Sequence, residues 1–167
     1  GVPYQMATSF SMSPMTSVAA GGLSTLTIEA GVTIKFKNGG PSVSYSLGLG
    51  SSNGNLPVNI FPVRLIAAGT QAQPIVLTSS AASPAAGDWG GIEWNGGPAD
   101  GNVMSHVRVE YAGGDSGTQG FGCGEGDNDA ALIFANWRPD DAFITDSTIS
   151  SSASGGIVSG WRTDLNG

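Results

Sequence analysis

The chain has 167 residues and a formal net charge of −7, and only 11% of its residues are charged. This acidic balance argues against a nucleic-acid partner, because phosphate backbones are bound by clusters of lysine and arginine. No run of apolar residues is long enough to cross a bilayer as a helix. The 27 glycines and 9 prolines separate short Val, Ile, Leu and Thr runs, and no longer stretch has apolar positions at helical spacing. We therefore predict one all-β domain over residues 1–167.

The N-terminal third begins with a strand-like segment, residues 1–22, which we expect to form the first strand or a cap. Residues 26–36 follow, and their alternation predicts one inward-facing row of apolar side chains. That row consists of Leu26, Ile28, Val32, Ile34 and Phe36. The pattern returns after the excursion 37–62, where residues 74–78 correspond to residues 32–36.

Further along, two stretches recur at the same offset of about 40 residues, which is the self-similarity of a solenoid. Residues 90–94 recur as 130–134, and residues 103–109 recur as 143–149. A third copy, residues 155–158, follows after only about 25 residues. The longer interval therefore contains an inserted loop of about 15 residues. The acidic, glycine-rich run 113–129 fits this place.

These repeats predict a column of coils in which parallel strands lie about 4.8 Å apart and alternate side chains point inward. In the strand that begins at Val107, the alternation places Val107, Val109 and Tyr111 inside the column. The single histidine, His106, precedes this strand and corresponds to Asp146 one coil later. A histidine in register with an aspartate favours either a hydrogen bond between coils or a polar outward residue.

Four phrases of the sequence are informative about the family. They are Leu-Thr-Ile-Glu-Ala-Gly-Val-Thr-Ile-Lys-Phe at 26–36, Leu-Ile-Ala-Ala-Gly-Thr at 65–70, Pro-Ile-Val-Leu-Thr-Ser at 74–79 and Gly-Asp-Trp-Gly-Gly-Ile at 87–92. They resemble bacterial secreted and surface proteins with right-handed parallel β-helix repeats, the pectate-lyase-like superfold. The resemblance implies a right-handed β-solenoid with coils over residues 23–161, and a secreted or cell-surface location. Its members range from polysaccharide-degrading enzymes to adhesins, so it implies no single activity.

The C-terminal end, residues 162–167, is predicted to be a truncated end of the solenoid. Uncovered coils expose core side chains and unpaired strand edges, so we expect end-to-end association. The one cysteine, Cys123, is expected either to pair with a cysteine outside this segment or to be an unpaired loop residue.

The inserted loop also contains three alternating acidic residues, Glu125, Asp127 and Asp129. Oxygen ligands at alternate positions of a tight turn suit Ca²⁺. Neither an EF-hand loop nor a tandem Gly-Gly-x-Gly-x-Asp array accompanies them, so a solvated acidic loop is the alternative. Calcium is the one cofactor that the sequence indicates.

Catalysis, if present, would use Glu110, Asp115 and Arg108. A glycosidase needs two carboxylates about 5–9 Å apart, and Glu93 and the pair at 140–141 are further acidic residues near strand ends. Lyases of the β-helix type use acidic calcium ligands with a basic residue as proton acceptor, but no stretch of this sequence matches their catalytic stretches. The chain has 6 basic residues, so a groove for an acidic polysaccharide would contain few positive charges.

Aromatic side chains offer a different activity, the stacking of sugar rings. Trp137 and Trp161 lie outside the regular strand pattern and, with Tyr111, are the candidate ligand-binding residues. Covering the flank of the column is the alternative role for them. Trp94 corresponds to Phe134 and shares a face with Ile92, so it belongs to the core if Ile92 points inward.

Two functions follow from these features. The first is a non-catalytic extracellular or cell-surface module with a structural, adhesive or glycan-binding role, whose partner is a glycan or a cell-surface protein. The second is a polysaccharide-degrading enzyme, a lyase or glycoside hydrolase, that uses carboxylates near residues 110–129. We favour the first, because the spacing selects no single pair of carboxylates.

Overall fold

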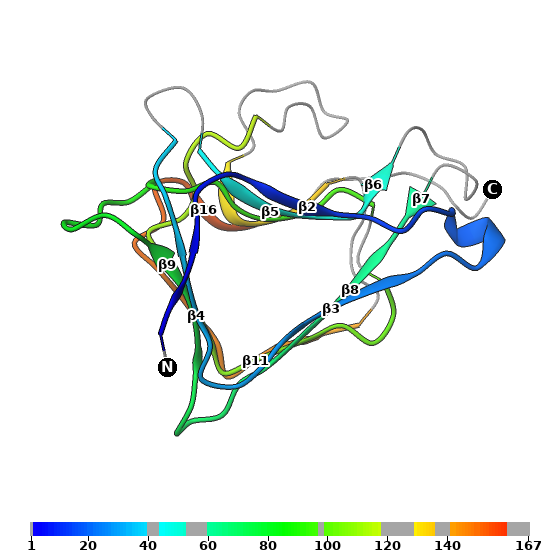
Figure 1. Cartoon of the computed structure of the whole chain (residues 1–167), viewed down its shortest axis with the longest axis horizontal. Coiled ribbons are helices and arrows are strands. Elements are labelled where there is room, and N and C mark those ends of the chain that lie inside the picture. The colour runs from blue at the N-terminus through cyan, green and yellow to red at the C-terminus, as the bar shows by residue number, and fades with distance from the viewer. Residues whose placement is uncertain are drawn as a thin grey trace.

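The structure of the protein is a computed structural model that describes residues 2–39, 44–52, 60–96, 99–117, 129–135 and 141–159. Within these ranges the regular secondary structure is almost entirely β-strand, and the strands superimpose along three sides of a triangle in Figure 1. Each of the first four passes of the chain around the triangle adds one strand to each side, and the described part of the fifth pass adds a strand to two sides. The prediction of an all-β chain with stacked parallel strands is therefore confirmed.

The strands follow one another in five passes. The first pass contains β1 (Tyr4–Met6), β2 (Phe10–Met12) and β3 (Ser24–Ile28), and the second contains β4 (Thr33–Phe36), β5 (Ser46–Leu49) and β8 (Val63–Ala68). The third pass contains β9 (Ile75–Ser79), β10 (Gly91–Trp94) and β11 (Val103–Ser105), and the fourth contains β12 (Val107–Glu110), β13 (Ala130–Phe134) and β14 (Ile144–Thr145). The fifth pass contains β15 (Thr148–Ser150) and β16 (Gly155–Ser159). One corner carries two small elements: the 3-10 helix η1 (Val18–Ala20) lies between β2 and β3, and the antiparallel pair of β6 (Ser51–Ser52) and β7 (Ile60–Phe61) lies between β5 and β8.

Three parallel sheets result from these passes. Sheet A has the order β1-β4-β9-β12-β15, sheet B the order β2-β5-β10-β13-β16, and sheet C the order β3-β8-β11-β14. The predicted offset of about 40 residues is the separation in sequence between residues that pair on neighbouring strands, since Trp94 pairs with Phe134 and Val109 with Ile149. The shorter third copy is also confirmed, because Leu132 pairs with Ile157.

The register differs from the sequence prediction at one place, the start of β9. Matching residues 74–78 to 32–36 would align Pro74 with Val32, but the structure pairs Ile34 with Leu77. The prediction was thus wrong by one residue. Pro74 has no backbone N–H to give to a parallel ladder. The strand therefore begins at Ile75, whose amide donates to the carbonyl of His106.

The core is a column of apolar side chains from alternate strand positions. Val107 and Val109 are fully buried, whereas Arg108 between them is exposed, as the alternation predicted. Ile92 and Trp94 are also fully buried, so the assignment of Trp94 to the core is confirmed. Its ring stacks on that of Phe134, with the ring centres 4.8 Å apart. Large rings stacked between coils remove extensive apolar surface from water, which is the main stabilising contribution here.

The corner between sheets C and A contains left-handed residues. His106 has φ of 50° and Asp146, one coil later, has φ of 48°. Among residues with a side chain, histidine, aspartate and asparagine are enriched in this conformation. The side chain of His106 lies beside Ser105, with Nδ1 and Oγ 3.0 Å apart, and its backbone amide donates to Thr145 of the next coil. The correspondence of His106 and Asp146 is therefore a repeated turn.

Tyr111 corrects another expectation. It was predicted to continue the inward row of Val107 and Val109, but it is only half-buried and has φ of 63°. A left-handed residue rotates the side chain out of strand alternation. Ser151 has the same conformation, with φ of 54°, at the corresponding position of the next coil. The inward row of β12 therefore ends at Val109.

The first pass leaves part of the core column open to solvent. Tyr4 and Phe10 pair with the inward residues Ile34 and Leu47, yet they remain 65% and 37% exposed. At the other end, Ile157 pairs with Leu132 and remains 53% exposed. Residues 1–22 thus supply β1 and β2, the outermost strands of sheets A and B.

Candidate ligand-binding groove

The corner between sheets A and B has the most variable connections of the fold. Its successive connections are residues 7–9, 37–45, 80–90, 111–129 and 151–154. The connection between β12 and β13 is the longest, and it includes the predicted inserted loop 113–129. Of this loop the structure describes residues 113–117 and 129. Long loops at one corner of a regular scaffold are where repeat proteins commonly place ligand contacts.

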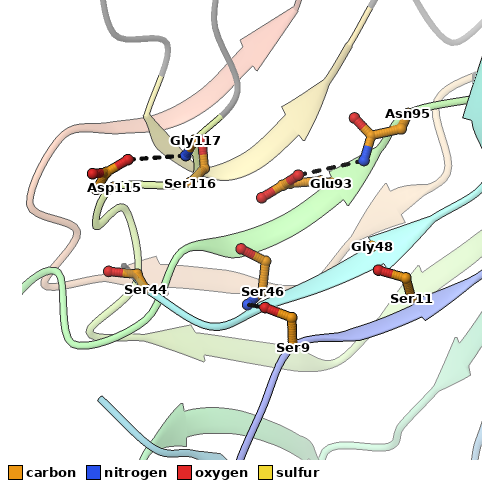
Figure 2. A pocket seen from close by; sticks show the side chains of 10 residues that line it. All are labelled: Ser9, Ser11, Ser44, Ser46, Gly48, Glu93, Asn95, Asp115, Ser116 and Gly117. Atoms are coloured by element: carbon orange, nitrogen blue, oxygen red, sulfur yellow. Dashed lines mark hydrogen bonds between the residues drawn. The ribbon is translucent and has the colours of Figure 1, made fainter. Parts of the chain in front are cut away.

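A polar cavity of about 290 Å³ lies beside this corner on the outer face of sheet B, and Figure 2 shows its lining. We call it the serine groove. The described residues that line it are glycines or have hydroxyl, amide or acidic side chains: Ser9, Ser11, Ser44, Ser46, Gly48, Glu93, Asn95, Asp115, Ser116 and Gly117. The volume is just below the range of about 300–1,000 Å³ that is typical of sites for drug-sized molecules. It therefore suits a small unit such as a monosaccharide ring.

The floor of the groove is formed by three neighbouring strands. Because Leu47, Leu49 and Trp94 point into the core, the residues between them and their partners face outward. Ser11 of β2, Gly48 of β5 and Glu93 of β10 therefore form one outward row, in direct register. Figure 2 shows Ser11, Ser46 and Glu93 on the same side of the sheet.

Gly48 makes a notch in this floor. A Cβ atom at this position would lie 2.8 Å from Oγ of Ser11, so any larger residue would push against that hydroxyl. A second row lies next to it, where the amide of Ser46 donates to Oγ of Ser9 over 3.1 Å. Glycine at 48 consequently leaves room in the floor for the Ser11 hydroxyl.

The wall of the groove is the beginning of the inserted loop. The carbonyl of Asp115 accepts a hydrogen bond from the amide of Ser44 over 3.1 Å, which ties the loop to the preceding coils. The Asp115 carboxylate accepts from the amide of Gly117 over 2.9 Å, forming a tight local turn. Asp129 holds the other side, because its Oδ1 accepts from the amide of Ser116 over 2.8 Å.

Glu93 is the buried acid of the site. Its exposed fraction is 6%, and Nδ2 of Asn95 lies 3.4 Å from its Oε2. An ionised carboxylate only accepts hydrogen bonds, whereas each serine hydroxyl can both donate and accept. The groove therefore presents many hydrogen-bonding positions of both kinds, with acceptors in excess near Glu93.

Asp88 positions the strand that carries Glu93. Its carboxylate accepts hydrogen bonds from Oγ of Ser79 over 2.6 Å, from the amide of Ala85 over 3.0 Å and from Nδ2 of Asn38 over 3.2 Å. Burial raises the pKa of Asp88, but these hydrogen bonds outweigh that effect and hold its pKa below the usual value of 3.8. The next residue, Trp89, stacks on Phe36 with the ring centres 4.1 Å apart.

A comparison with models of protein families identifies the family of the chain. Residues 2–131 match the model of the pectate-lyase-like beta helix domain. The chain belongs to this family. No curated protein and no solved structure gives a significant match. The match covers the coils that form the floor of the serine groove and the wall residues 115–117.

Not all of the predicted catalytic residues of this pectate-lyase-like chain meet in the groove. Asp115 lines it, but Glu110 and Arg108 lie on the outer face of sheet A. There Nη2 of Arg108 contacts Oε1 of Glu110 at 2.6 Å, and Oγ1 of Thr78 donates to the other carboxylate oxygen over 3.2 Å. The Arg108 side chain is 56% exposed, so this ion pair adds little stability.

The remaining predicted residues are placed as follows. Tyr111 is half-buried at the end of β12 and does not line the groove. Asp129, the described member of the predicted calcium set, accepts the hydrogen bond from Ser116. Trp137, Trp161, Glu125, Asp127 and Cys123 lie outside the described residues. Within the described ranges, no group of three or more His, Cys, Asp or Glu side chains is arranged to hold a metal ion.

Sequence reasoning missed the serines of the groove, although a signal was present. In the segments Phe10-Ser11-Met12 and Ser46-Leu47-Gly48-Leu49, small polar residues alternate with large apolar ones. This alternation predicts a strand with a small, polar outer face. In the part of the chain that the structure describes, no helix is long and apolar enough to cross a membrane.

Proposed function

We propose that the chain is a non-catalytic, glycan-binding module of a secreted or cell-surface protein, and that the serine groove binds the glycan. One observation carries the proposal: five serine hydroxyls, an amide and two carboxylates line one cavity on a rigid sheet. Sugars present many hydroxyl groups, and such a lining can pair with them as donors and as acceptors. The family resemblance supports the secreted location.

Binding rather than cleavage is favoured by where the acidic and basic residues lie. A β-helix lyase or hydrolase acting through residues 108–115 would need Arg108, Glu110 and Asp115 beside one substrate. Arg108 and Glu110 contact each other on sheet A, whereas Asp115 lines the groove over sheet B. The alternative of a polysaccharide-degrading enzyme retains one carboxylate pair in the groove, Glu93 and Asp115. It predicts new reducing or unsaturated sugar ends on incubation with polysaccharides, with loss in a Glu93→Gln or a Glu110→Gln variant.

The test of glycan binding uses Gly48→Val, which places a branched side chain against the Ser11 hydroxyl in the floor. Titration calorimetry with neutral and acidic oligosaccharides should detect a ligand of the wild-type protein, and Gly48→Val should weaken its binding at least tenfold. The control is Ser150→Val, which places the same side chain at an exposed strand position of sheet A. Failure of every oligosaccharide to bind, or equal binding by Gly48→Val, would overturn the proposal.

Association between copies is a further part of the proposal, supported by Tyr4, Phe10 and Ile157. Each belongs to an inward row yet remains substantially exposed, so stacking one column on another would bury apolar surface and pair strand edges. Because such a contact joins two different ends, it generates open chains rather than closed dimers. Sedimentation velocity should show species that grow with concentration, and Tyr4→Lys should suppress them; concentration-independent monomers would contradict this.

We also infer that the coil is right-handed, since connections between parallel strands of one sheet have this hand in nearly all proteins. Calcium in the loop containing Glu125, Asp127 and Asp129 stays a prediction. A rise in melting temperature with added Ca²⁺ would support it, because a ligand of the folded state stabilises that state.

A further inference from the structure

Two Asn-Gly steps lie within the described residues, at 38–39 and at 95–96, and the fold holds them in opposite ways. In such a step the backbone nitrogen of the glycine can attack the side-chain carbonyl carbon of the asparagine. Glycine is the most favourable next residue, because it has no Cβ atom to obstruct the approach and the widest range of backbone conformations. The reaction still requires that the chain around the asparagine can change its conformation.

The step at Asn95 is enclosed. The amide of Asn95 donates to the carbonyl of Leu49 over 2.9 Å, which continues the ladder between β10 and β5. Gly96 is buried, and a Cβ atom there would lie 2.6 Å from the carbonyl oxygen of Phe61 and 2.8 Å from the amide nitrogen of Ser51. Backbone atoms of two neighbouring strands therefore hold this step in one conformation and oppose ring closure.

The step at Asn38 is open to solvent. The ladder with the first coil extends to the residue before it, where the amide of Lys37 donates to the carbonyl of Met6 over 2.9 Å. Asn38 and Gly39 follow β4 outside any strand, and both are exposed. A change of backbone conformation therefore meets much less resistance at Asn38 than at Asn95.

The side chain of Asn38 nevertheless has a defined role in the fold. Its Nδ2 donates to Oδ1 of Asp88 over 3.2 Å, and Asp88 is only 7% exposed. The other oxygen of this carboxylate accepts from Oγ of Ser79 and from the amide of Ala85. An acid in place of the amide would remove the donor, because an ionised carboxylate only accepts hydrogen bonds. Two carboxylates side by side also repel each other.

We propose that Asn38 is a site of spontaneous deamidation and that the reaction weakens the corner between sheets A and B. A bond forms from the backbone nitrogen of Gly39 to Cγ of Asn38, the bond from Cγ to Nδ2 breaks, and Nδ2 leaves as ammonia with the proton of the Gly39 amide. Water then opens the cyclic imide at either carbonyl carbon, which gives aspartate or isoaspartate. Both products face Asp88 with a carboxylate, and isoaspartate also routes the backbone through Cβ. The reaction requires only water, so it is independent of glycan binding.

The first test incubates the folded protein in mildly alkaline buffer and follows, by peptide mass spectrometry, the gain in mass that marks an amide converted into an acid. Asn38 should be modified at least tenfold faster than Asn95. Fragment ions distinguish Asn38 from Asn53, which lies in the same tryptic peptide. In urea the steps at Asn38 and Asn95 should react at similar rates, because the fold no longer separates them. Equal rates in the folded protein, or faster reaction of Asn95, would overturn the proposal.

Two variants test the assigned chemistry. Gly39→Ala should slow the modification of Asn38 at least tenfold, since a Cβ atom hinders ring closure. Asn38→Gln retains an amide but has to close a larger ring, so modification at this position should stop. Modification of Asn38 at the wild-type rate in Gly39→Ala would show that Gly39 is not the attacking residue and would overturn the assignment.

Asn38→Asp reproduces one product and tests its effect on the corner. In urea denaturation its midpoint should be lower than that of Asn38→Ala, because alanine only removes the hydrogen bond to Asp88, whereas aspartate also adds repulsion. The control is Gln71→Glu, which adds the same charge at an exposed position of the corner between sheets C and A and should leave the midpoint unchanged. A midpoint of Asn38→Asp equal to that of Asn38→Ala or of the wild type would overturn the weakening of the corner.

Discussion

Two corners of the triangular fold behave in opposite ways. Between sheets C and A the connections are residues 29–32, 69–74, 106 and 146–147, and between sheets A and B they extend to the long segment 111–129. The short corner repeats the same left-handed turn at His106 and Asp146, whereas the long corner supplies Ser9, Ser44 and Asp115 to the serine groove. One corner keeps the register of the coils, which leaves the other free to vary in length and to contact ligands.

The variable corner still needs an anchor, and Trp89 provides it. The side chain is fully buried and stacks on Phe36, with the ring planes inclined by only 2°. Its Nε1 also donates to the carbonyl of Glu110 in the next coil over 2.8 Å. This one residue therefore joins the corner of the third pass to the strands before and after it.

Replacing Trp89 should have the largest effect on stability. Trp89→Ala would leave a cavity beside Phe36, and we expect a loss of about 3–5 kcal/mol in the free energy of unfolding. Trp89→Phe retains a ring for the stack and loses the hydrogen bond to Glu110, so it should cost about 1 kcal/mol. Urea denaturation measures both values. A loss below about 1 kcal/mol for Trp89→Ala would show that the corner is not anchored in this way.

Asp88, next to this anchor, should give the corner a pH dependence. Because its folded-state pKa lies below the usual value of 3.8, its contribution is complete above that value and is lost as the pH falls through the folded pKa. Asp88→Asn should cost about 1.5–3 kcal/mol at pH 7, the range for hydrogen bonds to a charged group. The difference between wild type and variant should shrink below pH 3.8.

Unfolding free energies measured from pH 7 to acid would test this prediction. Asp146→Asn is the matched control, because Asp146 is exposed and asparagine suits its left-handed turn. Its stability should follow the wild-type curve. A constant difference between wild type and Asp88→Asn at all pH values would contradict the assigned role of the carboxylate.

The coils could be predicted from the sequence because stacking in register forces inward residues to recur at the same spacing. Trp94 and Phe134 show this, since each is followed by a corresponding strand of sheet C after the same interval. The slip at Pro74 and the outward rotation of Tyr111 have a different origin. Both depend on backbone conformation at a corner, where a missing N–H or a positive φ overrides alternation.

The serine groove could be predicted only in part. The alternation around Ser11 and Ser46 indicates outward hydroxyls, and Glu93 and Asp115 were recognised as acidic candidates. Their convergence could not be predicted, because it depends on how the loop after β12 returns over the earlier strand β5. That path is fixed by the hydrogen bond from the amide of Ser44 to the carbonyl of Asp115, two residues far apart in sequence.

The short corner between sheets C and A provides the smallest of these effects and the most direct test of the contrast between corners. His106 adopts φ of 50°, which a β-branched side chain tolerates poorly, so His106→Val should destabilise the protein by about 1–2 kcal/mol. His106→Asn should be close to neutral, since asparagine accepts this conformation and the backbone bonds to Thr145 and Ile75 remain. Thr148→Val, an exposed strand position two residues after the equivalent turn, controls for the change to valine. Equal stability of the three variants in urea denaturation would mean that the left-handed turn does not set the register, because the corner would then accept any residue.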